Sequence, residues 1–397
     1  ITPAPAVADT KEAGRALFAR LAVNADAQAG LQALAGWPEN NMNPIYLEID
    51  EPTAKTFPWE QLCVGDTFFS LRWSWQIARV ARPREEDPRP YVTSPELRLL
   101  VVLSALGRQA MGEWQSSRDD VETGRTLGLN IKFLVSVTEL DVRTAIDDYI
   151  AAGNAPVTRL DPPATAGDVR GLIQDVKPQI VHMYAHGAVR NGARVLSFAK
   201  TSDWDADDKA HGSINLQLAD VSRAARNGCV WLVFLNACKS AAAEGDRIDG
   251  DDEVRSFVGD LVIEGVPAAI GHRRAIESID AHRFAEPLYG AIFRLLEDPL
   301  AQPGQHVMEW APVMFDARER LANEYGDPST ADNWSVPVLY VRPTGFLIDV
   351  AADDVHAEAV REDLSRDMAY DEALETLENF DLPPGLEDQV LGLFTGT

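Results

Sequence analysis

Short apolar runs alternate with longer amphipathic segments through the middle of the chain. Each run has the length of a buried strand, and the segments between several of them repeat apolar residues at helical spacing. The expected strands cover residues 45–49, 97–103, 131–137, 180–185, 230–237, 268–270 and 336–341. The clearest expected helices cover residues 139–152, 165–175, 218–226 and 280–296. This alternation predicts an α/β fold with a mostly parallel central sheet and helices on both faces.

The two ends of the chain differ from this middle part. Residues 11–34 are rich in Ala and Leu at helical spacing, and Trp37-Pro38 ends the pattern. Residues 346–397 hold 14 acidic and 2 basic residues, a net charge of −12, with a helical apolar stripe over 355–380. We therefore expect a helical extension over 1–44, an α/β body over 45–345 and an acidic helical tail over 346–397.

Composition narrows the classes of partner. The chain carries 62 acidic and 36 basic residues, a net charge of −26. Such a field opposes direct contact with nucleic-acid phosphates and anionic membranes, so neither is an expected partner. No uninterrupted apolar stretch reaches the ~18 residues of a membrane span. The three cysteines are a sparse, odd set, which is typical of a reducing cytoplasm, where we expect the protein to act.

Two of the apolar runs end in residue types that can do covalent chemistry. Residues 180–184 lead into Ala185-His186-Gly187, and residues 230–235 lead into Asn236-Ala237-Cys238. In a mostly parallel sheet the carboxyl ends of the strands share one edge, where active sites gather. If the two strands are neighbours, an imidazole and a thiol come together there. That pair is typical of a cysteine peptidase.

A cysteine peptidase needs the thiolate, because the thiol is a poor nucleophile. At pH 7 a free thiol with a pKa of ~8.5 is only about 3% ionised, and a neighbouring imidazole can take its proton and later protonate the leaving amine. Gly187 permits a sharp turn whose N–H groups could bind an oxyanion, and a helix beginning at 239–241 would lower the thiol pKa further. The alternative, in which Cys238 is a buried small hydrophobe and His186 a loop residue, stays open on this pattern alone.

Other chemistries fit the sequence less well. His182 and His186 have the spacing of a helical zinc site, but in a strand they would lie ~13 Å apart. No second cluster of metal ligands accompanies them, so we expect no metal and no other cofactor. Along an expected strand, Cys229 and Cys238 would lie roughly 30 Å apart, far beyond the ~7 Å limit for a disulfide.

Six blocks of the sequence, in this order, resemble those of the CHAT peptidases, a caspase- and separase-like family of the caspase clan. The first is Pro58-Trp59-Glu60-Gln61-Leu62, which is similar to the family's Pro-Trp-Glu landmark. The histidine block contains His186 and the cysteine block contains Cys238. The remaining five blocks are 180–187, 235–241, 265–271, 284–289, and 317–318 together with 334–340. The shared order makes the resemblance specific, and it extends over residues 45–342.

The resemblance implies a caspase-like α/β sandwich in which residues 45–160 support a catalytic half over 161–345. It also implies that Cys238 attacks a peptide carbonyl, that His186 transfers the proton, and that the backbone N–H groups of Gly187 and Cys238 form the oxyanion hole. The expected function is a cysteine endopeptidase of narrow specificity, activated by a partner in bacterial defence or cell-death signalling. The alternative is a catalytically silent caspase-like scaffold that binds partners through its acidic surface and tail.

Acidic residues near these blocks are candidates for substrate binding. The loop 246–253 follows the cysteine block, and the resemblance implies that it borders the S1 pocket, which holds the P1 side chain. Many relatives carry Asp near Ser278, which acidic residues flank here. The candidates, which would favour Arg or Lys at P1, are Asp249, Asp251, Asp252, Glu277 and Asp280. The same loop could instead bind calcium or be a solvated loop, and the tail 346–397 is the candidate surface for an activating protein.

Overall fold

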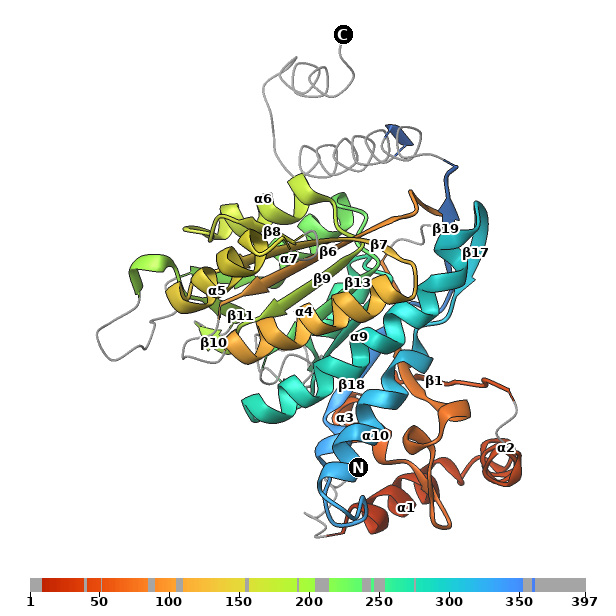
Figure 1. Cartoon of the computed structure of the whole chain (residues 1–397). Coiled ribbons are helices and arrows are strands. Elements are labelled where there is room, and N and C mark those ends of the chain that lie inside the picture. The colour runs from red at the N-terminus through yellow and green to blue at the C-terminus, as the bar shows by residue number, and fades with distance from the viewer. Residues whose placement is uncertain are drawn as a thin grey trace, which may run out of the picture.

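A nine-stranded sheet forms the centre of the molecule, with helices on both faces (Figure 1). The computed structural model describes residues 9–38, 41–50, 52–84, 90–104, 110–153, 157–190, 193–203, 214–237, 244–245, 254–274, 276–352 and 359–360. The strand order is β1-β4-β18-β16-β13-β9-β6-β7-β8. These strands are β1 (Ile45–Glu48), β4 (Ile77–Val80), β6 (Glu96–Leu103), β7 (Asn130–Val137), β8 (Val157–Leu160), β9 (Ile180–Tyr184), β13 (Leu232–Asn236), β16 (Ala268–His272) and β18 (Pro337–Val341).

Helices and small sheets surround the central sheet. The α-helices are α1 (Thr10–Leu21), α2 (Ala25–Gly36), α3 (Pro52–Lys55), α4 (Ala110–Thr126), α5 (Leu140–Ala151), α6 (Ala166–Val176), α7 (Leu218–Asn227), α8 (Phe257–Ile263), α9 (Ser278–Ala301) and α10 (Met314–Glu324). The 3-10 helices are η1 (Trp59–Gln61), η2 (Phe69–Leu71), η3 (Trp73–Trp75), η4 (Thr201–Asp203), η5 (Ala311–Val313) and η6 (Asn333–Ser335). In the described part of the chain, no helix has the length and hydropathy that crossing a lipid bilayer requires.

Four small sheets complete the described structure. Two have three strands: β10 (His186–Arg190), β11 (Ala193–Phe198) and β12 (Ile214–Gln217) form one, and β17 (Gly304–Met308), β19 (Phe346–Val350) and β5 (Tyr91–Thr93) form the other. Two have two strands: β2 (Cys63–Val64) with β3 (Thr67–Phe68), and β14 (Glu244–Gly245) with β15 (Val254–Arg255).

Every run predicted as a strand lies in the central sheet. The six neighbouring strands from β16 to β8 are parallel, and β18, β4 and β1 run the opposite way after the antiparallel pairing of β16 with β18. The predicted α/β architecture, with a mostly parallel central sheet flanked by helices, is confirmed. The sequence did not reveal β4, where Arg79 interrupts the apolar pattern, or β8, an edge strand in which only Val157 is buried.

Alternation along the strands divides the core into two layers. Val101 of β6 and Phe234 of β13 face the layer covered by α4, α5, α9 and α10. Their neighbours Val102 and Leu235 face the layer covered by α6, α7 and α8. The same alternation directs the even-numbered residues of β9, β13 and β16 towards the α4–α9 side of the sheet.

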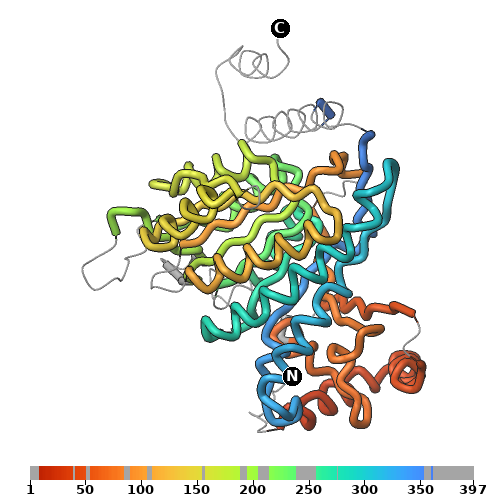
Figure 2. Tube along the Cα trace, viewed as in Figure 1, coloured from red at the N-terminus to blue at the C-terminus, as the bar shows by residue number. Residues whose placement is uncertain are grey.

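The N-terminal helices pack against the body. The backbone N–H of Thr10 donates to the carbonyl of Ser329 at 2.8 Å, and Figure 2 shows the red N-terminal helices beside the blue segment that holds α10. A Cβ at Gly14 would lie 2.0 Å from the carbonyl oxygen of Gln61, so glycine is required where α1 meets that backbone. The described part of 1–44 is thus mostly helical, and its Leu17 and Leu31 share a core with Phe57, Trp59, Leu62, Phe69, Trp75 and Ile77.

The Pro58-Trp59-Glu60 block is bound to β4, the strand next to the edge strand β1, by an ion pair that we call the Glu60–Arg79 clamp. Arg79 of β4 donates to the two carboxylate oxygens of Glu60 at 2.9 and 2.8 Å, and both side chains are buried. Arg79 also donates to the carbonyls of Lys55 and Phe57, each at 2.9 Å. Burial raises the pKa of Glu60, but Arg79 outweighs this effect and holds the pKa below its usual value. The block therefore builds an ionised, buried ion pair.

Arg318, from the last of the six blocks, joins two strands in a similar way. It is buried in α10 and donates to the backbone carbonyls of Ile77 at 3.4 Å and Pro337 at 3.2 Å, and to the side-chain oxygen of Gln76 at 3.1 Å. Burial lowers the pKa of Arg318 to about 10, which still leaves it charged at neutral pH. Arg318 therefore holds β4 and β18 together.

The body extends further along the chain than the sequence indicated. Phe346–Val350 was assigned to the acidic tail, but it forms β19, which pairs with β17 and β5. Its burial alternates, with Phe346, Ile348 and Val350 inside, which is the period of a half-buried strand. The high acidic content of the following residues hid this pattern. Of the rest of the expected tail, residues 353–358 and 361–397 lie outside the described residues.

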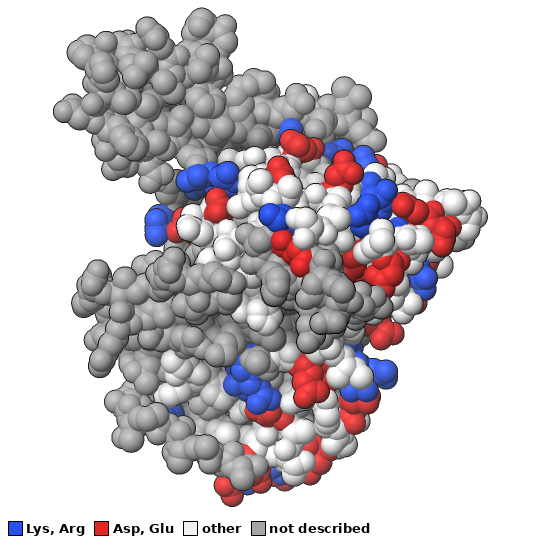
Figure 3. Space-filling model, turned by 90° about the vertical axis from the view of Figure 1, so that its left-hand side faces the viewer, with Lys and Arg blue, Asp and Glu red and all other residues white. Residues whose placement is uncertain are grey.

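Charge on the described body is mixed. Residues 346–397 account for −12 of the net charge of −26. On the face shown in Figure 3, acidic and basic side chains of the described residues are interspersed. The described residues on that face therefore show no extended area of a single sign.

The Glu60–Arg79 clamp makes a prediction for stability. Glu60→Gln should lower the free energy of unfolding by about 3–5 kcal/mol, because it leaves Arg79 buried without its counter-charge. Urea unfolding followed by tryptophan fluorescence measures this loss. Glu48→Gln is the matched control, since Glu48 pairs with Arg82 on the surface and such pairs contribute little. Equal losses in the two variants would contradict the clamp.

Asp120 of α4 makes a prediction for pH dependence. Its side chain is buried, and burial, with repulsion from Glu286, raises its pKa to about 9. In the unfolded chain the pKa is ~3.9, so its contribution to stability is present below pH ~4 and is lost as pH rises towards 9. Asp120→Asn should therefore be more stable than the wild type at pH 8, and this advantage should shrink by up to about 1.4 kcal/mol per pH unit towards pH 5.

Urea unfolding at pH 5 and pH 8 measures this difference for Asp120→Asn. Asp119→Asn, an exposed neighbour on the same helix, is the control and should show no such dependence. An advantage of Asp120→Asn that is the same at both pH values would show that Asp120 is ionised in the folded protein.

Candidate active site

Strands β9 and β13 are parallel neighbours in the middle of the sheet, as the peptidase hypothesis requires. Their register pairs Tyr184 with Asn236. His186 follows Tyr184 by two residues, and Cys238 follows Asn236 by the same two. Neighbouring strands lie about 4.8 Å apart. The chain therefore leaves the sheet at the same edge and level in both places, and Cys238 itself lies outside the described residues.

His186 is exposed at the start of β10, where it pairs with Ser197 of β11. Ser104, which follows β6, binds the end of β9 just before His186 and also the residue that follows β11, the strand paired with β10. Its backbone N–H donates to the carbonyl of Tyr184 at 2.9 Å, and its hydroxyl accepts the backbone N–H of Ala199 at 2.7 Å. The imidazole of His186 thus stands in solvent on a segment that is fixed before and after it.

Gly187 has an extended conformation in β10, opposite Leu196, and it is not among the residues with positive φ. The structure therefore has a strand where the sequence suggested a sharp turn, because β11 offers Gly187 a pairing partner. The helix expected to begin at 239–241 lies outside the described residues. The oxyanion hole formed by the N–H groups of Gly187 and Cys238 stays a prediction.

Three of the five acidic candidates for substrate binding lie outside the described residues, namely Asp249, Asp251 and Asp252. Glu277 is exposed and is the N-cap residue of α9. Asp280 is buried and accepts hydrogen bonds from the hydroxyl of Tyr325 at 2.6 Å and from the amide of Asn333 at 2.7 Å. Each of its carboxylate oxygens therefore has a partner within the fold.

We call the edge of the sheet where β9 and β13 end, just before His186, the His186 edge. Beneath it, on the α4–α9 side of the sheet, six polar side chains form what we call the Glu113 cluster. At its centre Glu113 of α4 is fully buried, and one of its carboxylate oxygens accepts the side-chain amide of Asn236 at 2.9 Å. The same oxygen lies 3.0 Å from Nε2 of His182, and the other lies 3.2 Å from Nε2 of His282. The members are Glu113, His182 of β9, Asn236 of β13, His272 of β16, and His282 and Tyr289 of α9.

The charges in the cluster follow from its contacts. Burial raises the pKa of Glu113, but His182, His282 and Asn236 outweigh it and hold the pKa below its usual value. Because an ionised carboxylate can only accept, the amide nitrogen of Asn236 faces Glu113 and the amide oxygen faces His272. Nε2 of His272 donates to that oxygen at 2.8 Å, and burial lowers the pKa of His272 to about 3, so it is neutral.

The hydroxyl of Tyr289 completes the arrangement. Burial raises its pKa well above the usual value, so it keeps its proton and donates to Nδ1 of His182 at 2.6 Å. That bond leaves Nε2 of His182 as the nitrogen that carries a proton towards Glu113. The ring of His182 also stacks on Phe234, with centroids 4.5 Å apart. Strands β9 and β13 are thus tied to α4 and α9 through oriented side chains.

Sequence reasoning did not single out this cluster. In the sequence, His182 drew attention only through a zinc spacing that did not fit a strand, and Asn236 only as part of the cysteine block; both side chains are buried. One signal could have revealed them: His182, Asn236 and His272 are polar residues on the same face of buried strands, near or at their carboxyl ends. Glu113 gave no such signal, because it lies in a helix far from these strands in the sequence.

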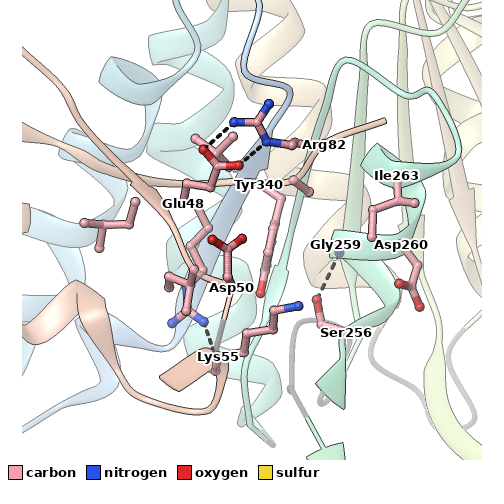
Figure 4. Close-up of a pocket in the computed structure, with 14 residues that line it drawn as sticks. Glu48, Asp50, Lys55, Arg82, Ser256, Gly259, Asp260, Ile263 and Tyr340 are labelled. Atoms are coloured by element: carbon pink, nitrogen blue, oxygen red, sulfur yellow. Dashed lines mark hydrogen bonds and ion pairs between the residues drawn. The ribbon is translucent and has the colours of Figure 1, made fainter. Parts of the chain in front are cut away.

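A separate pocket of ≈ 210 Å³ lies between α8, the edge strand β1 and its neighbour β4 (Figure 4). Figure 4 shows Arg82 paired with Glu48, and Asp260 of α8 across from them. Three basic and three acidic side chains line it, and no residue of β9, β10 or β13 does. The pocket is therefore not part of the His186 edge.

Solved structures offer similar folds at low identity. Separase of Saccharomyces cerevisiae in complex with securin is 13% identical with a TM-score of 0.39, covering 78% of this chain but only 16% of the separase chain. The Arg-specific cysteine proteinase gingipain R is 9% identical with a TM-score of 0.45, covering 82% of this chain and 69% of that one. The complex of pro- and mature domains of Porphyromonas gingivalis RgpB gives 10% identity and a TM-score of 0.46, covering 83% and 71%.

Comparison at the level of sequence is more specific. No curated protein matches the chain. The sequence profile of the CHAT domain matches residues 11–301, which is well over half of the chain and includes α1, the central sheet up to β16, and both motif strands. The chain therefore belongs to the CHAT domain family.

Proposed function

We propose that this protein is a cysteine endopeptidase in which Cys238 is the nucleophile and His186 the general base and acid. Membership of the CHAT family supports a cysteine peptidase. The observation that carries the residue assignment is the register of β9 with β13, which pairs Tyr184 with Asn236 and so gives the two following motifs the same offset. The solvent exposure of His186 supports its role, because a catalytic imidazole must reach a substrate.

The proposed reaction has two halves. His186 takes the proton of the Cys238 thiol, and the thiolate adds to the carbonyl carbon of the scissile peptide bond. The oxyanion that forms is stabilised by the backbone N–H groups of Gly187 and Cys238. The C–N bond then breaks as His186 gives its proton to the leaving amine. Water, deprotonated by the same imidazole, hydrolyses the thioester and restores the thiol.

We assign recognition of the P1 side chain of the substrate to the segment after Cys238. Asp249, Asp251 and Asp252 would supply carboxylates for an Arg or Lys side chain at P1, and the exposed Glu277 could add another. Asp280 takes no part in this proposal, because both its oxygens already accept hydrogen bonds inside the fold. Such a pocket would restrict cleavage to few sites and so give narrow specificity.

The cellular role rests on family resemblance alone. It points to cleavage of a protein substrate in bacterial defence or cell-death signalling, in the cytoplasm, after activation by a protein that engages residues beyond β19. Cys63 and Cys229 are buried and form no disulfide with one another, which is compatible with a reducing compartment.

Cleavage-site mapping by N-terminal proteomics tests the proposal. Wild-type protein expressed in its host should generate new N-termini that follow Arg or Lys, and both Cys238→Ala and His186→Ala should lose them, because each removes one member of the dyad. Cys63→Ala, which changes a buried thiol elsewhere, should keep them. Unchanged cleavage by Cys238→Ala would refute the peptidase assignment, and cleavage only after acidic residues would refute the basic P1 pocket.

A further inference from the structure

The Glu113 cluster joins the strands that precede the proposed dyad to the helices that cover them. Glu113 comes from α4, and its carboxylate contacts His182 of β9, Asn236 of β13 and His282 of α9. The amide of Asn236 also lies 3.5 Å from the carbonyl of Ala281 in α9. One carboxylate thus fixes four elements of the fold relative to one another.

These contacts lie close to the proposed catalytic residues along the chain. Asn236 is two residues before Cys238, and His182 is four residues before His186. Both strands are extended and buried, so a displacement of Asn236 or His182 moves the end of its strand. Misplacing a catalytic group by about 1 Å can cost roughly 10²-fold in rate.

The surroundings of Glu113 exclude other roles. Its side chain is 0% exposed, so it cannot contact a substrate. Within the described residues, no group of His, Cys, Asp and Glu has the geometry of a metal site. If Glu113 binds neither substrate nor metal, its burial only lowers the free energy of unfolding, because the charge must be removed from water. An apolar side chain at this position would avoid that loss. What this buried set of polar contacts can provide is a fixed arrangement of the strands and helices that carry it.

We propose that Glu113 is a positioning residue of the peptidase: through Asn236 and His182, its buried carboxylate sets the separation between Cys238 and His186. This inference rests on the proposed function, because it requires the dyad. Glu113 acts on the reaction only through the strand ends and does not touch the reacting atoms.

The rate at which iodoacetamide alkylates Cys238 at pH 7 tests this role without a known substrate. Mass spectrometry of the digested full-length chain reports the rate for each cysteine. A free thiol is about 3% ionised at this pH, so pairing with His186 should accelerate the reaction by about tenfold or more, and His186→Ala should lose that acceleration. Glu113→Ala should lose it too, and Glu113→Ala/His186→Ala should react no more slowly than His186→Ala alone.

Two matched variants separate positioning from a general effect on α4. Glu113→Gln keeps the size of the side chain. Its amide oxygen can still accept from Asn236 while its amide NH2 group faces His282. The rate at which Cys238 is alkylated in this variant should therefore stay within about threefold of the wild type. Asp120→Asn changes a second buried carboxyl on the same helix and should react like the wild type.

The outcomes distinguish the two proposals. If His186→Ala leaves the rate of Cys238 unchanged, the proposed function fails. If His186→Ala slows it but Glu113→Ala does not, the dyad stands and the positioning role is wrong. Rapid alkylation of the buried Cys63 and Cys229 would show that Glu113→Ala is unfolded. In that case Asn236→Ala is measured instead, because this variant leaves the contacts of Glu113 with His182 and His282 in place. If Asn236→Ala is folded and its Cys238 is alkylated as fast as in the wild type, the proposal is wrong.

Discussion

The parallel pairing of β9 with β13 is the constraint on which the proposed chemistry depends. Parallel strands bring their carboxyl ends to one edge, and the register pairs Tyr184 with Asn236, each of which is two residues before a proposed catalytic residue. The same pairing, with two-residue alternation, directs His182 and Asn236 to the α4–α9 side, where Glu113 reaches both. The edge and the buried cluster beneath it are thus two consequences of one strand pairing.

Buried charges hold distant segments of this fold together. Glu60 binds Arg79 of β4, the strand next to the edge strand β1. Arg318 joins β4 to β18, and Glu113 joins the central strands to α4 and α9. In a medium of low dielectric each of these groups is costly unless its partners are in place, so each specifies one arrangement of its neighbours. Two of them, Glu60 and Arg318, belong to blocks that resemble the CHAT peptidases. Part of that resemblance therefore records how the fold is assembled and not how it reacts.

The sequence predicted the central sheet because a buried strand is a local pattern of consecutive apolar residues. It did not reveal α4, because Glu113, Ser117 and Asp120 interrupt the apolar pattern of its buried face. The strand at Phe346–Val350 was hidden by the acidic residues that follow it. The sequence placed His186 and Cys238 after the ends of two apolar runs, but it left open whether those strands are neighbours, which the pairing of β9 with β13 shows. The Glu113 cluster could not be anticipated, because it depends on contacts between segments far apart in the chain.

The most direct measurement is a crystal structure of the protein labelled with a peptidyl acyloxymethyl ketone that carries Arg at P1. The account predicts a thioether bond to Sγ of Cys238, an imidazole of His186 within about 4 Å of that sulfur, and the Asn236 amide still bound to Glu113. A label on Cys63 or Cys229 instead, or a His186 ring remote from a labelled Cys238, would contradict it.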